Sequence, residues 1–265
     1  MCHVHALAQG TMLLSALTIM KYKDIVSATF IERPNRFVAR IRLQDGTEAL
    51  CHVKNTGRCK ELLVDDAKVW VEDHAGRMGS RKLRYSLIGV EKKTENGTLM
   101  INMDSQVPNV LVKEALENGV INIPGFGTPA VIRPETVHGD SRFDFYLKNS
   151  DGLECFAEVK GVTLEHGGVA AFPDAPTERG VKHIEGLIRA KEEGYAAAII
   201  FVIQMEGMKY MIPNDKTHPQ FGDALRRAQK AGVSVLAYEC SIKPDEVHIT
   251  GPVDVFPCNA SITPL

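Results

Sequence analysis

Hydrophobic and polar residues alternate in short runs through the first third of the chain. The runs cover residues 25–32, 37–43, 48–54, 68–73 and 85–92, and polar turns separate them. Alternation with a period of two is typical of strands that bury one face. The turn Gln44–Thr47 joins two of these runs and indicates a hairpin. Five short strands within about seventy residues predict a small barrel of the oligonucleotide-binding (OB) type.

The rest of the chain has longer apolar runs and helical spacing. Residues 96–108 read as a linker, after which a short helix is expected over 109–117 and a strand over 130–137. Further on, helices are expected after Thr177 and from Pro219 to Ala231, with apolar strands over 196–205 and 233–238. Such runs are typical of buried parallel strands, and their alternation with helices predicts an α/β sheet with right-handed crossovers.

A hairpin over residues 141–160 is the most informative stretch. Phe143, Phe145 and Leu147 alternate with polar residues, which predicts one apolar face and places Asp144 on the other. A turn centred on Asp151 puts Asp144 opposite Glu158, with Cβ atoms about 5 Å apart. The pattern therefore predicts two carboxylates on one face of the hairpin.

Two carboxylates at this separation repel each other unless a cation lies between them. Oxygen ligands suit Mg²⁺ or Mn²⁺, and Lys160, two residues beyond Glu158, is placed to orient or deprotonate a water. This set predicts phosphodiester hydrolysis. A surface hairpin with ordinary charges is the alternative, since a β-bulge would turn Asp144 to the other face. Glu114, at the edge of the 109–117 helix stripe, either reaches this site as a further metal ligand or faces water.

Composition places the chain among globular proteins. Its 265 residues are 44% hydrophobic, and its six cysteines include no Cys-x-x-Cys pair, which indicates reduced thiols and a cytoplasmic location. The apolar run 12–20 follows no Lys or Arg and is too short to span a bilayer, so we expect neither a signal peptide nor a membrane partner. Residues 1–20 are treated as an extension without an assigned role.

The charge is distributed unevenly along the chain. Residues 21–96 carry 16 Lys and Arg against 11 Asp and Glu, a net of +5, whereas residues 97–265 carry 15 against 22. A basic front favours polyanion binding, although a solvated surface explains the same imbalance. The few aromatic residues of the front part indicate no base-stacking surface. The candidate phosphate contacts are Arg33, Arg36, His52, Asn55 and Arg58 in the barrel and Arg179, Lys182 and His183 near the start of the second helix.

Two further segments carry expectations. The loop 161–176 contains the Gly167–Gly168 pair and follows Lys160 directly, so we expect a mobile loop that closes over the site. The Pro-containing segment after Gly251 is expected to be poorly ordered.

Several motifs together resemble one known family. They are Arg33-Pro-Asn-Arg-Phe37, His52 through Arg58, Ser141-Arg-Phe-Asp-Phe145, Glu158-Val-Lys160, and Phe172-Pro-Asp-Ala-Pro-Thr-x-Arg-Gly180 followed by Lys182-His183. Over residues 21–250 or so the chain resembles the sugar fermentation stimulation protein family. It departs from many relatives at Lys54, where they carry Pro.

The resemblance implies an N-terminal five-stranded OB-like barrel followed by a PD-(D/E)xK nuclease-like α/β domain with a mixed central sheet, α+β overall. We accordingly expect an extension (1–20), a nucleic-acid-binding barrel (21–96), a nuclease-like domain (97–252) and a tail (253–265). The resemblance implies that Asp144 and Glu158 are metal ligands, that Lys160 is the catalytic lysine, and that Glu114 is a looser match to an acidic residue of the first core helix.

The predicted function is a metal-dependent nuclease acting on DNA or RNA with little sequence preference. The alternative from a different class is a non-specific DNA-binding regulator of sugar metabolism without a physiological cleavage role. A phosphoesterase for small molecules fits the hairpin but leaves the basic front unexplained. The sequence is compatible with a homodimer.

Overall fold

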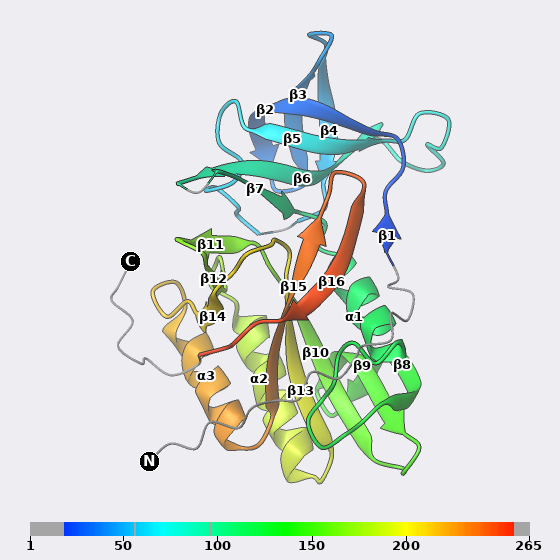
Figure 1. The fold of residues 1–265 in the computed structure, drawn as a ribbon, viewed down its shortest axis with the longest axis vertical. Helices are drawn as coiled ribbons and strands as arrows, with labels where there is room; N and C mark the ends of the chain where they lie inside the picture. The colour runs from blue at the N-terminus through cyan, green and yellow to red at the C-terminus, as the bar shows by residue number, and fades with distance from the viewer. Residues whose placement is uncertain (1–18, 56, 96, 257–265) are drawn as a thin grey trace.

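The computed structural model describes residues 19–55, 57–95 and 97–256 (Figure 1). A β-barrel occupies one end of the molecule, and a layered α/β domain occupies the other. Among the described residues, no helix is long and apolar enough to cross a membrane.

The barrel follows the alternating runs closely. Its strands are β2 (Ile25–Asn35), β3 (Val38–Leu43), β4 (Glu48–Val53), β5 (Lys68–Asp73), β6 (Tyr85–Thr94) and β7 (Gly97–Asn102). They are ordered β4-β3-β2-β5-β6-β7, and a parallel pairing of β4 with β6 closes the barrel. Ala39, Ile41, Cys51 and Val53 face its interior and are fully buried. The OB-type barrel predicted from period-two alternation is confirmed.

Strand β7 corrects the predicted linker. All of β7 pairs antiparallel with the second part of β6, from the pair Thr94–Gly97 to the pair Gly89–Asn102. Residues 97–102 therefore belong to the barrel and are not a connection between domains. The chain leaves the barrel only at Met103.

The second domain is built on a mixed seven-stranded sheet ordered β1-β16-β15-β13-β10-β9-β8. Its strands are β1 (Met20–Lys21), β8 (Pro129–His138), β9 (Ser141–Asn149), β10 (Glu154–Val162), β13 (Ala196–Ile203), β15 (Ser234–Ile242) and β16 (Glu246–Pro252). Strands β10, β13 and β15 are parallel, and for β13 and β15 the apolar runs predicted this arrangement.

Helices cover both faces of this sheet (Figure 1). Helix α1 (Val107–Glu117) lies on one face, and α2 (Glu178–Glu192) and α3 (Pro219–Lys230) pack side by side on the other. Thr177 is the predicted N-cap of α2, and its hydroxyl accepts a hydrogen bond from Gly180 N at 3.0 Å. This hydrogen bond pairs a backbone N–H that has no partner within the helix, and it fixes where the first turn of α2 begins.

The segment after Lys160 is not the mobile loop that was expected. Strands β11 (Leu164–His166) and β12 (Val169–Phe172) form a hairpin with Gly167–Gly168 at its turn, and β12 pairs in parallel with β14 (Tyr210–Pro213). The two glycines adopt positive φ angles of 59° and 81°, which a tight turn requires. The segment predicted as a lid therefore supplies two strands of a small three-stranded sheet, and β14 is the third.

The end of the chain is also more regular than expected. Strand β16 continues to Pro252, and Val255 forms a bridge with Met211. Residues 257–265 of the predicted tail and residues 1–18 of the predicted extension lie outside the described residues.

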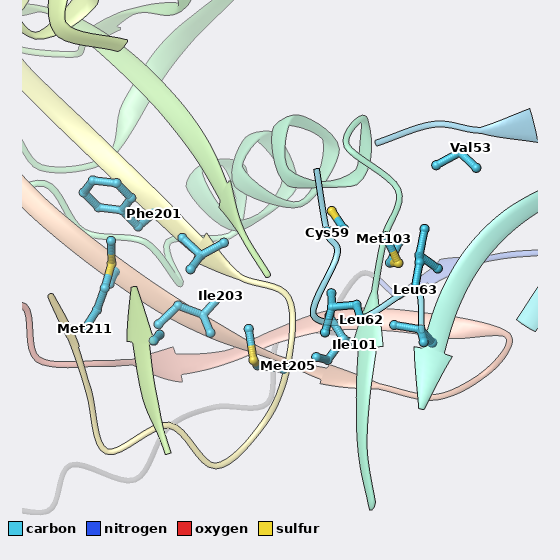
Figure 2. Close-up of a cluster of buried hydrophobic side chains, with 14 of the residues drawn as sticks. Val53, Cys59, Leu62, Leu63, Ile101, Met103, Phe201, Ile203, Met205 and Met211 are labelled. Carbon is cyan, nitrogen blue, oxygen red and sulfur yellow. The ribbon is translucent and has the colours of Figure 1, made fainter. Parts of the chain in front are cut away.

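One continuous hydrophobic cluster joins the two parts of the molecule. Figure 2 shows Leu62, Ile101 and Met103 of the barrel side beside Ile203 and Met205 of the α/β domain. Two ion pairs reinforce this contact, Lys54 with Asp104 at 2.5 Å and Lys92 with Glu165 at 2.5 Å. Both acids are almost fully buried. The shared core holds the barrel in a fixed orientation over the sheet.

Candidate functional site

The site is built where the ladder between β9 and β10 ends. The last paired residues are Phe145 and Ala157, so the next positions on the two strands are Asp144 and Glu158. This is the predicted register. Beyond it the strands no longer pair directly, and the backbone N–H of Val159 donates to Asp144 Oδ2 at 2.7 Å. The Asp144 side chain thus replaces a backbone bond at the end of the ladder.

The same break changes which residues share a face. Phe145 and Leu147 pack in the core on the α1 side, but Phe143 packs on the α2 side, 5.4 Å from Phe156 between ring centroids. The prediction that all three share one apolar face is wrong at Phe143. Because the strand leaves its partner at Asp144, the alternation does not carry across that residue.

Glu158 is the most enclosed polar residue of the site. It is 2% exposed, and its Oε1 accepts hydrogen bonds from Lys160 Nζ and His183 Nδ1. Its Oε2 is buried and has no hydrogen-bond partner among the described residues. Burial alone raises the pKa of Glu158, but the hydrogen bond from His183 and the charge of Lys160 outweigh it and hold the pKa below its usual range.

Asp144 has the opposite electrostatic balance. Its Oδ1 accepts from Asn109 Nδ2 at 2.9 Å, so both of its oxygens face neutral N–H donors. Burial, and secondarily the charge of Glu158, raises the pKa of Asp144 above its ordinary value. Asn109 lies in the first turn of α1, just after Pro108. Glu158 is therefore paired with Lys160 and His183, whereas Asp144 accepts hydrogen bonds from the neutral N–H groups of Asn109 and Val159.

These residues fit a hard divalent cation. The donors are carboxylate oxygens, and one of them, Glu158 Oε2, is buried without a hydrogen-bond partner among the described residues. Lys160 and His183 both contact the other oxygen of Glu158. Mg²⁺ is commonly held by one or two carboxylates together with waters and substrate phosphates. Asp144 and Glu158 are the residues that would hold it.

Glu114 does not join this pair. Among the described residues, no three His, Cys, Asp or Glu side chains are grouped closely enough to hold a metal ion. Asn109, not Glu114, is the residue of α1 that reaches Asp144. Five residues along a helix correspond to a rotation of about 140°, which turns Glu114 to a different side. Glu114 was predicted as a further metal ligand, but it is not grouped with Asp144 and Glu158, although its Oε2 is also buried without a hydrogen-bond partner among the described residues.

The basic residues of α2 separate into two groups. His183 is buried against Glu158, and Arg179, one turn earlier, donates from Nε to His183 Nε2 at 3.3 Å. Lys182 instead points to the turn between β8 and β9, 3.6 Å from Asp140, which also binds Arg189. The predicted cluster of three is thus wrong at Lys182, because adjacent residues of a helix face different directions.

Arg33 has a structural role that the sequence did not reveal. Its Nη1 donates to the carbonyl oxygens of Gly57 and Arg58, and its Nη2 donates to those of Arg36 and Asn55, all at 2.7–2.9 Å. Both terminal nitrogens are committed to folding the 55–58 turn. The predicted phosphate contact of Arg33 is therefore replaced by an internal one.

The other barrel candidates surround this turn. Arg36 and Arg58 are exposed, and the Arg36 guanidinium lies 4.7 Å from the centre of the Phe37 ring. His52 is half-buried on β4, and the Asn55 side chain accepts from Gly57 N at 2.8 Å, which closes the turn. A Cβ placed on Gly57 would lie 2.4 Å from Asp174 Oδ2. Because Asp174 lies just before α2, this end of the barrel adjoins the helix that carries Arg179 and His183.

Sequence reasoning missed the role of Asn109 and the pairing of His183 with Glu158. Asn109 follows a proline at a helix start, the only local signal that it carries. The sequence marks His183 only as one of three basic residues near the start of α2, because its acidic partner, Glu158, lies 25 residues away along the chain. Only the packing of α2 on the sheet brings the two together.

Both the barrel and the α/β domain match profiles of known protein domains. The profile of the SfsA N-terminal OB domain matches residues 31–101, and that of the sugar fermentation stimulation protein RE (restriction endonuclease-like) domain matches residues 106–246. A sugar fermentation stimulation protein homolog of Clostridium beijerinckii is 48% identical over 89% of this chain and 99% of its own length. One from Desulfitobacterium hafniense is 48% identical over 86% of this chain and 95% of its own.

A solved structure has the same fold. The structure of Pyrococcus furiosus SfsA in complex with Ca²⁺ matches 89% of this chain and 98% of its own, with a TM-score of 0.78 and 26% identity. The agreement extends across both the barrel and the α/β domain.

Proposed function

The chain belongs to the sugar fermentation stimulation protein family, and from this premise we propose that it is a metal-dependent nuclease that hydrolyses phosphodiester bonds of DNA or RNA with little sequence preference. In this proposal the barrel binds the nucleic-acid backbone and the restriction endonuclease-like domain cleaves it. A cytoplasmic location is part of the same proposal.

One observation carries the proposal. Asp144 and Glu158 meet where the β9–β10 ladder ends, and a buried oxygen of Glu158 is left without a partner beside Lys160. Leaving a buried charged oxygen unsatisfied is costly, so a site of this kind is expected to bind a cation. The Ca²⁺ in the Pyrococcus furiosus relative supports a divalent ion. For catalysis we propose Mg²⁺ or Mn²⁺.

The chain's own groups have distinct roles. A bound metal ion would polarise the phosphate and lower the pKa of a water. Lys160 supplies an ammonium close to the carboxylates, where it stabilises charge that develops on the phosphate. Asn109 holds Asp144 in place through Oδ1. The two Nη groups of Arg179 have no hydrogen-bond partner among the described residues. They are available to bind two oxygens of a backbone phosphate.

Nucleic-acid binding is assigned to the barrel end around the 55–58 turn. Arg58 lies in this turn, Arg36 lies in the neighbouring connection between β2 and β3, and both are exposed. Gly57 of the turn adjoins Asp174, in the segment that leads into α2. Phosphate contacts of this kind position the chain without reading bases. The fixed core between the two domains keeps the binding and cleavage sites at a constant separation.

The test is a cleavage assay with labelled single- and double-stranded DNA and RNA in Mg²⁺, Mn²⁺ or chelator. We expect cleavage of at least one substrate with metal and none with chelator. Asp144→Asn and Glu158→Gln should abolish most of it, whereas Lys160→Ala should slow cleavage and leave metal affinity nearly intact.

Asp151→Asn is a matched control, since Asp151 is an exposed acid in the turn of the same hairpin. Cleavage by Asp144→Asn at the parental rate would rule out the hairpin as the active site. Metal-independent binding without cleavage of any substrate would favour the DNA-binding regulator instead.

A further inference from the structure

Arg179 and His183 form a fixed chain of hydrogen bonds to Glu158. Arg179 Nε–H points to His183 Nε2 at 3.3 Å, and His183 Nδ1 contacts Glu158 Oε1. The two residues are one helical turn apart on α2, so their side chains lie on the same face. Arg179 therefore supports the contact between His183 and Glu158 by hydrogen bonding to the other side of the imidazole ring.

This chain determines where the imidazole carries its proton. An arginine is always protonated and its Nε can only donate, so His183 Nε2 must be the acceptor. A proton on Nε2 would set two donors against each other. The remaining proton lies on Nδ1, which donates to Glu158 Oε1. The two hydrogen bonds together select the tautomer with its proton on Nδ1.

The surroundings hold this arrangement in place. The His183 ring packs edge-on against Phe143, with centroids 6.4 Å apart, and is 7% exposed. The first turn of α2 is pinned by the Thr177 cap and by Gly180, where a Cβ would lie 3.1 Å from Phe221. Lys160, the other donor to Oε1, is a flexible side chain. The imidazole is the rigid contact.

We propose that Arg179 and His183 are positioning residues for Glu158: Arg179 fixes the Nδ1–H tautomer of His183, and His183 holds Oε1 so that Oε2 stays free to bind the metal ion. This inference rests on the proposed metal-dependent function. Outer hydrogen bonds of this kind orient ligands, and their loss commonly lowers metal affinity about 10–100-fold.

The first experiment reads the tautomer directly. Long-range ¹H–¹⁵N spectra of the metal-free protein distinguish a protonated ring nitrogen from a bare one. We expect the parent His183 to carry its proton on Nδ1 alone, and Arg179→Lys, which keeps the charge but lacks the Nε donor, to give a mixture of tautomers. Arg189→Lys, the same change in an exposed residue of α2, should leave the His183 signals unchanged.

The second experiment measures metal binding without catalysis. Calorimetry with Mn²⁺ alone should show about a 10-fold or greater loss of affinity for His183→Leu. His183→Asn should stay close to the parent, because the asparagine amide nitrogen lies as many bonds from the backbone as Nδ1. His183→Gln, whose amide matches Nε2, should not rescue. His138→Asn, at a half-buried histidine 2.7 Å from Glu193, is the control and should not change the affinity.

The outcomes separate the two proposals. A parental His183 with its proton on Nε2, or His183→Asn binding Mn²⁺ as weakly as His183→Leu, overturns the positioning role. A parent protein that binds no Mn²⁺ overturns the metal-dependent function and the orientation of Oε2 with it, while the imidazole spectrum still decides whether Arg179 sets the tautomer.

Discussion

Glu158→Gln should destabilise the protein in chelator far more than Asp144→Asn. Both substitutions remove one negative charge from the same site, and a description of the two as equivalent ligands would predict similar effects. The structure distinguishes them. Asp144 is buried against neutral donors and a second carboxylate, whereas Glu158 is paired with Lys160 and His183.

The magnitudes follow from these contacts. Neutralising Asp144 relieves its burial as a charge and its repulsion from Glu158, but an asparagine amide can accept only one of the two N–H donors that Asp144 accepts. These effects oppose each other, so we expect this variant to stay within about 1 kcal/mol of the parent. Glu158→Gln removes the charge that Lys160 and His183 pair with, and breaking a buried pair costs about 3–5 kcal/mol. For a chain of this size the unfolding midpoint should change by less than about 4 °C for Asp144→Asn and fall by about 6–20 °C for Glu158→Gln.

The pH dependence gives a second signature in chelator. The raised pKa of Asp144 means that its ionised form costs stability at neutral pH, and this cost disappears as the pH falls below the folded-state value towards about 4. The lowered pKa of Glu158 means that its contribution is present above its unfolded value of about 4.3 and is lost as the pH falls further. The deficit of Glu158→Gln should therefore shrink in acid, whereas Asp144→Asn should lose stability relative to the parent as the pH falls towards about 4.

Thermal unfolding of the parent, the two variants and Asp151→Asn in chelator, from pH 4 to pH 8, measures these shifts. Adding Mg²⁺ should then raise the midpoint of the parent and of Asp151→Asn but of neither site variant, because only a binding-competent native state gains from the ligand. Equal destabilisation by Asp144→Asn and Glu158→Gln at pH 7 would refute the electrostatic reasoning.

Three other predictions concern binding and packing. Nucleic-acid affinity should fall steeply with salt, and Arg36→Ala or Arg58→Ala should each reduce the slope of log K against log salt by about one; a salt-insensitive complex would contradict this. Gly186→Ala should cost about 1–3 kcal/mol in a urea titration, because the added Cβ would lie 2.6 Å from Ser141 Oγ, and an unchanged midpoint would show that α2 is packed less tightly. Lys54→Met should lower the unfolding midpoint by leaving Asp104, which is 1% exposed, without its cation, so parental stability would argue against a buried pair.

The sequence by itself determined the elements and the register of the central hairpin. Alternation with a period of two predicted five of the six barrel strands, and the turn around Asp151 placed Asp144 opposite Glu158. These are local properties, because side-chain direction in a strand and the position of a tight turn depend on neighbouring residues. A local pattern also located the start of α2 at Thr177.

Tertiary structure decided which side chains meet. Asn109 rather than Glu114 reaches Asp144, and Arg33 folds the 55–58 turn through four carbonyl oxygens, although its sequence context reads as a phosphate contact. His183 finds Glu158 only because α2 packs across β10. Each of these contacts joins residues that are distant along the chain, and their geometry depends on helix rotation and on the end of a strand ladder, which no local periodicity encodes.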